Sequence, residues 1–96
     1  MSRRRFDHLL AEISVAAGSR IPRYALWMRI HESGCDPEDL TPRASLAFCD
    51  GPLARFLAEH GLQLSPRAQR RLRRAVRSYD PTVPSPEEVL FGAPQS

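Results

Sequence analysis

The sequence contains no lysine and no asparagine, only two cysteines and one tryptophan, and no long apolar run. Without a stretch of about 20 apolar residues the chain offers no candidate for a membrane-spanning helix, and we expect no insertion into a bilayer. Two cysteines are too few for the disulfide framework that holds small secreted domains together. Because lysine is missing, all 14 basic side chains are arginines.

The beginning of the sequence does not resemble a secretory signal. The basic residues 3–5 are followed by acidic and polar residues between 7 and 12, which interrupt the apolar stretch that such a signal needs. We therefore expect a cytoplasmic protein in which Cys35 and Cys49 are reduced. The abundance of Ala, Arg and Pro, with no Lys or Asn, is typical of a GC-rich bacterial genome.

A chain of 96 residues forms one domain at most. A domain of this size buries roughly 60–65% of the surface that its unfolded chain exposes, enough for one core. A deep catalytic cleft is uncommon in so small a core, so the length favours binding over catalysis.

Proline and glycine divide the chain into short segments with helical periodicity, and no segment alternates as a strand does. The expected helices are residues 6–17, 22–33, 42–50, 52–60 and 66–79. Thr41, Ser65 and Ser85 each precede a proline, the pattern of an N-cap followed by the first helical residue. The sequence therefore predicts an all-α fold, a small single-domain bundle of four to five short helices.

The predicted helical domain covers residues 1–80, and a Pro-rich tail with one short helix at 86–91 covers residues 81–96. The segment 22–33 is apolar over more than half its circumference, which predicts that it is the central helix, with Trp27 in the middle of the core. The expected core residues are Leu9, Ile13, Leu26, Trp27, Ile30, Leu46, Phe56, Leu57 and Leu72.

Acidic and basic residues are concentrated in different segments of the chain. Residues 31–64 hold two arginines and six acidic residues, whereas residues 65–78 hold six arginines and no acidic residue. In a helix over 66–78 these arginines lie opposite the apolar side, and seven like-charge neighbours cost on the order of 1.5–3.5 kcal/mol before salt screening. The arginines are Arg67, Arg70, Arg71, Arg73, Arg74 and Arg77.

Two interpretations of this cationic face stay open. It is either a solvated face, partly neutralised by the chain's own Asp36, Glu38 and Asp39, or a docking surface for an anionic partner. The docking interpretation predicts a non-enzymatic accessory or regulatory protein that binds a protein partner. A tail with Val89, Leu90 and Phe91, which could be donated to that partner, supports this function.

The alternative function is nucleic-acid binding, because residues 53–72 resemble a helix-turn-helix motif formed by the helices 52–60 and 66–78. At the position where such motifs carry a β-branched apolar residue, this chain has Gln69. The resemblance implies base contacts from Arg67, Gln69, Arg70 and Arg71. It implies phosphate contacts from Arg73, Arg74 and Arg77.

No pattern predicts a metal site or an enzyme. His31, Cys35, Cys49 and His60 lack the tight two-residue separation of common structural zinc sites. No nucleophile with a base, phosphate-binding glycine loop or matched pair of carboxylates is present, so we expect no catalytic residues and no cofactor. His8, beside an acidic residue near the N-terminus, is expected to be exposed and inert.

Overall fold

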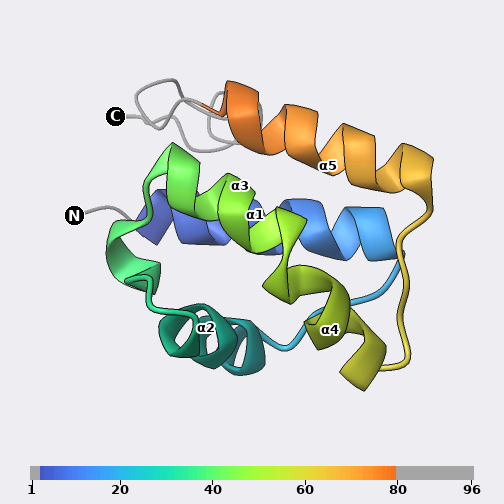
Figure 1. Ribbon diagram of the computed structural model, residues 1–96, viewed down its shortest axis with the longest axis horizontal. Coiled ribbons are helices and arrows are strands. Elements are labelled where there is room, and N and C mark those ends of the chain that lie inside the picture. Colours follow the sequence, from blue (N-terminus) through green and yellow to red (C-terminus); the bar gives the residue numbers. More distant parts are fainter. Residues whose placement is uncertain (1–2, 80–96) are drawn as a thin grey trace, which may run out of the picture.

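The computed structural model describes residues 3–79, and these residues confirm the all-α fold (Figure 1). They form five α-helices and one turn of 3-10 helix, with no strand in this part of the chain. The elements are α1 (Arg3–Ala17), α2 (Arg23–Glu32), η1 (Pro37–Asp39), α3 (Pro42–Asp50), α4 (Pro52–Glu59) and α5 (Pro66–Ser78). The predicted tail and its short helix at 86–91 lie outside the described residues.

Two of the three predicted N-caps are confirmed. The Thr41 hydroxyl accepts a hydrogen bond from the Ala44 amide at 3.0 Å, and the Ser65 hydroxyl accepts one from the Ala68 amide at 3.0 Å. Each bond satisfies one of the amides that a helix start leaves without a partner. Ser85, the third predicted cap, lies outside the described residues.

The predicted interruption between α3 and α4 is present at Gly51 and Pro52. Pro52 has no amide hydrogen to donate to the Phe48 carbonyl, so the helix cannot continue straight through this point. The Gly51 amide instead donates a hydrogen bond of 3.3 Å to the Phe48 carbonyl oxygen. The chain then bends and begins α4, which leads away from the end of α3 at an angle (Figure 1).

The central helix is α1, and the prediction that α2 is central is wrong. One side of α1 packs against α5 and another packs against η1, whereas α2 lies at the edge of the bundle beside α4 and η1 (Figure 1). A helix at the edge buries only the stripe that faces its neighbours, here Leu26 and Ile30. The rest of its broad apolar arc stays at the surface, where Tyr24 is 74% exposed.

The expected core needs two further corrections, because Trp27 and Leu46 are only partly buried. The Trp27 ring lies at the edge of the core and stacks on the His31 ring, with centroids 5.4 Å apart. The large side chains that fill the core are phenylalanines instead. The buried apolar residues are Phe6, Leu9, Ile13, Ile21, Leu26, Ile30, Leu40, Phe48, Cys49, Leu53, Phe56, Leu57, Leu72 and Val76.

His8 joins α1 to the end of α5, which corrects the expectation that it is exposed and inert. Its ring stacks on the Tyr79 ring, with centroids 4.0 Å apart and planes 14° from parallel. Burial lowers the pKa of His8 below its ordinary value of 6.5, Glu12 opposes this shift, and Arg5 adds to it. The folded protein therefore favours the neutral imidazole.

This lowered pKa predicts that the fold loses stability in mild acid. Above about pH 7.5 His8 is neutral in both the folded and the unfolded chain, and it adds no pH dependence. Below that pH the unfolded chain binds the proton more readily, so the free energy of unfolding falls. His8→Phe keeps a stacked ring and should flatten this fall between about pH 7 and pH 5.5, measured by denaturant titration. His31→Phe is the control, and an equal flattening in the control would contradict the assignment.

Candidate binding surface

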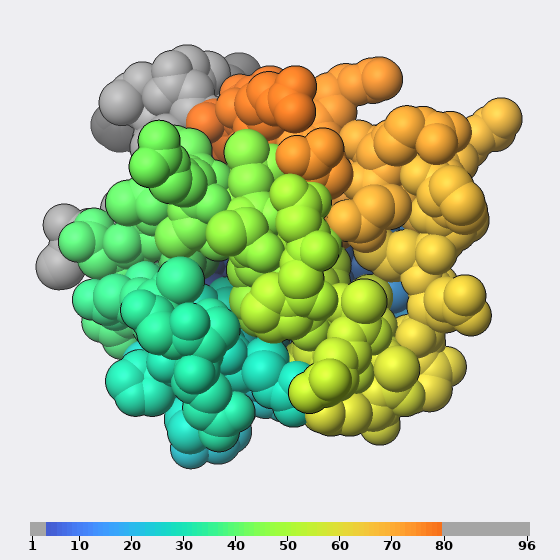
Figure 2. Space-filling model, viewed as in Figure 1, coloured from blue at the N-terminus to red at the C-terminus, as the bar shows by residue number. Residues whose placement is uncertain are grey.

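The helix α5 has one buried side and one charged side, as its sequence predicts. Leu72 and Val76 are buried where α5 packs against α1 and α3. Side chains of α5 project from one edge of the molecule (Figure 2). Five arginines on the charged side are exposed, and we call this set the arginine face: Arg67, Arg70, Arg71, Arg74 and Arg77.

The sixth arginine of α5 has a structural role. Arg73 is half-buried, and its Nε lies 2.8 Å from Oδ1 of Asp50 at the end of α3. The N–H does not point directly at this oxygen, so the contact is an ion pair rather than a linear hydrogen bond. It joins α5 to the end of α3 and removes Arg73 from the set available to a partner.

The arginine face is not neutralised within residues 3–79. None of its five side chains forms an ion pair there. Asp36, Glu38 and Asp39, which the solvated-face interpretation proposed as internal partners, also form no ion pair in that range. The Asp36 carboxylate instead caps η1, because its Oδ1 accepts a hydrogen bond of 3.0 Å from the Glu38 amide.

Gln69 points inward, away from the arginine face. Its Nε2 donates a hydrogen bond of 3.0 Å to the carbonyl oxygen of Cys49, at the end of α3. In a helix Gln69 falls beside Leu72 and Val76 rather than beside the exposed arginines, which explains this orientation. The expected contact of Gln69 with a base is therefore not supported by the geometry.

The two helices of the helix-turn-helix resemblance do not form a packed pair. α5 packs against α1 and α3, and α4 is not among the elements closely packed against it. Without that packing α4 cannot set the angle at which α5 would enter a DNA groove. The resemblance therefore extends to the order of the elements along the chain but not to their arrangement.

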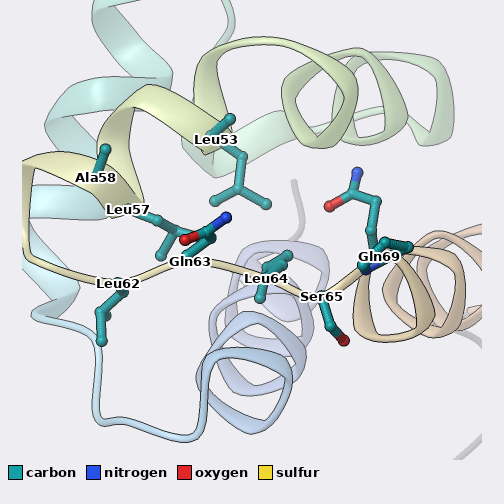
Figure 3. Close-up of a pocket in the computed structure, with 10 residues that line it drawn as sticks. Leu53, Leu57, Ala58, Leu62, Gln63, Leu64, Ser65 and Gln69 are labelled. Carbon is teal, nitrogen blue, oxygen red and sulfur yellow. The ribbon is translucent and has the colours of Figure 1, made fainter.

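An apolar groove lies between α4 and the first turn of α5, with a volume of about 510 Å³ (Figure 3). The residues 62–65 connect the two helices along the groove. No charged residue belongs to its lining, which consists of Leu53, Ala54, Leu57, Ala58, Leu62, Gln63, Leu64, Ser65, Pro66 and Gln69. The sequence predicts only a turn at this connection, and the pair of leucines within it is the signal that points to the groove.

The candidate metal ligands are not brought together. The part of the chain that the structure describes contains no group of three His, Cys, Asp or Glu residues that could hold an ion. The Nδ1 of His60 lies 3.0 Å from the Phe56 carbonyl oxygen. Cys49 is buried, and this burial raises the pKa of its thiol to about 12, with Asp50 adding to the shift and Arg73 opposing it.

Comparison with family models, with curated proteins and with solved structures gave no match to this chain. No helix between residues 3 and 79 has the length and apolar character needed to cross a bilayer. The inference of function therefore depends on the arginine face and the groove.

The burial of Cys49 predicts a large difference between the two thiols. With a pKa of about 12, Cys49 is a thiolate in only about one molecule in ten thousand at pH 8. We expect iodoacetamide to label only the partly buried Cys35 in the native protein, and both thiols in denaturant, as measured by mass spectrometry. Rapid native labelling of a Cys35→Ser variant would contradict this.

The crowding of charge on α5 predicts that removing one arginine stabilises the fold. Arg70 has three like-charged neighbours at helical spacing, so Arg70→Gln should raise the free energy of unfolding by about 0.5–1.5 kcal/mol at low salt. Screening should abolish this gain near 1 M salt. Arg43→Gln, on α3, is the matched control. No gain at low salt, or one that persists at high salt, would contradict the account.

Proposed function

We propose that this chain is a non-enzymatic accessory or regulatory protein that binds an acidic surface of a protein partner through the arginine face of α5. The observation that carries the proposal is that five exposed arginines share one face and have no ion-pair partner within residues 3–79. A partner that brings carboxylates to this face removes the repulsion between neighbouring guanidinium groups.

The chemistry of arginine suits this task. A guanidinium group presents several donors in one plane and can bind a carboxylate through two parallel hydrogen bonds. From residue 67 to residue 77 the face extends about 15 Å along the helix, at 1.5 Å per residue. It can therefore pair with several carboxylates on one acidic helix or strand. Several such pairs together fix the orientation of the partner on the arginine face.

Two observations favour a protein partner over nucleic acid. Gln69, the neutral polar side chain suited to reading adenine, is turned inward and bonded to the Cys49 carbonyl. Beside the arginine face lies an apolar groove, which a phosphate backbone cannot fill but an apolar side chain can. Nucleic-acid binding is therefore an outcome of the test below rather than a second proposal.

A matched pair of triple variants tests the proposal. Arg67→Gln, Arg70→Gln and Arg74→Gln together remove three charges from the arginine face, and the control removes three exposed arginines elsewhere, Arg20, Arg43 and Arg55. Both variants have the same net charge. The probes are labelled poly-L-glutamate and a labelled 20-base-pair DNA duplex, followed by fluorescence anisotropy at about 50 and 200 mM salt.

We expect the wild-type chain and the control to bind poly-L-glutamate, and the arginine-face variant to bind about tenfold more weakly. Used as bait in a nuclease-treated host lysate, the wild type and the control should retain one protein that the arginine-face variant loses. Equal loss of binding in both triple variants would show only a net-charge effect and contradict the proposal. Tighter binding to the duplex, with no protein retained after nuclease treatment, would favour nucleic acid.

A further inference from the structure

The apolar groove begins where the arginine face begins. Pro66 and Gln69 of α5 belong to its lining, and Arg70 follows Pro66 by one helical turn, on the same side of the helix. Opposite them, Leu53 and Leu57 of α4 supply apolar side chains to the lining (Figure 3). The groove therefore has an apolar interior with an exposed cation beside it.

The acidic side chains of the adjoining helices do not offset this positive charge. Asp50, at the end of α3, is paired with Arg73. Glu59, at the end of α4, is paired with Arg29. An apolar ligand that also carries carboxylates therefore meets an uncompensated guanidinium at the groove, whereas a basic ligand meets repulsion.

We infer that the groove holds one bulky apolar side chain, of leucine or phenylalanine type, from an acidic segment of the partner protein whose carboxylates lie along the arginine face. This inference rests on the proposed function and adds the feature by which the partner is selected. A volume of about 510 Å³ is more than enough to admit one such side chain together with part of the segment that carries it. Charge alone attracts many anions, and the apolar anchor restricts binding to segments that carry both features.

The described residues of a second copy offer no good occupant for the groove. Among the described residues the exposed large apolar side chains are Val15 and Tyr24. Tyr24 follows Arg23, whose Nη2 lies 2.7 Å from Oδ1 of Asp7. The acidic residue nearest to the Tyr24 ring on this side is therefore already paired. Leu40, which follows the acidic turn η1, is buried. Within residues 3–79, therefore, neither exposed apolar side chain lies beside an unpaired acidic residue.

The test uses three fluorescein-labelled peptides of equal length with the full chain. The first is rich in glutamate and has a central leucine, the second has alanine in place of that leucine, and the third has the leucine with glutamine in place of every glutamate. Two variants fill the groove from exposed positions on α4, Ala54→Trp and Ala58→Trp. Ala47→Trp places the same ring at an exposed position on α3, outside the groove, and is the matched control.

We expect the acidic leucine peptide to bind about tenfold or more tightly than the acidic alanine peptide, in line with the burial of one large apolar side chain. The groove-filling variants should lose this advantage and keep the affinity for the acidic alanine peptide. The control should behave as the wild type, and circular dichroism should give the same helix content for all four proteins. The neutral leucine peptide should bind most weakly.

The outcomes separate this inference from the proposed function. Equal affinity for the two acidic peptides, with binding still dependent on the arginine face, would overturn the groove inference and leave the proposed function standing. No binding of any peptide would overturn both. Dimerisation of the wild-type chain in sedimentation, abolished by Ala54→Trp and not by Ala47→Trp, would identify a second copy as the occupant and overturn the inference.

Discussion

The surface of this protein depends on how α5 is seated on α1 and α3. Leu72 and Val76 are buried in that contact, and Arg73 and Gln69 of α5 bind Asp50 and the Cys49 carbonyl at the end of α3. Because helical periodicity places the remaining arginines opposite this buried stripe, seating α5 in this way turns all five toward solvent. The same seating keeps α5 away from α4, and the space left between the two helices becomes the apolar groove.

The energetics of α5 explain why such a charged helix holds its place. Repulsion between its arginines costs on the order of 1.5–3.5 kcal/mol before salt screening. Burial of Leu72 and Val76 contributes about 1.5–3 kcal/mol each, and the Ser65 cap about 1 kcal/mol more. Burial and capping therefore outweigh the repulsion, and α5 stays packed on the rest of the fold. The repulsion between its arginines persists, however, and an acidic partner removes it. A surface of this kind is suited to reversible binding.

Features set by neighbouring residues could be predicted from the sequence, and features set by distant contacts could not. The caps at Thr41 and Ser65 and the break at Pro52 follow from local hydrogen bonding, and the charged side of α5 follows from its periodicity. The broad apolar arc around Trp27 does not reveal which stripe is covered, so the sequence alone predicts the wrong central helix. The inward turn of Gln69 and the groove arise only because α5 packs on α3, which no local pattern specifies.

The proposed function requires an arginine face that is exposed and has no ion-pair partner among residues 3–79. Limited modification with phenylglyoxal, mapped by mass spectrometry, tests it most directly because this reagent reacts with accessible guanidinium groups. We expect rapid modification of the five arginines of the face and slow modification of the half-buried Arg73 and Arg29, which are held by Asp50 and Glu59. Protection of the face to the same degree as Arg73, in the absence of any partner, would contradict the account.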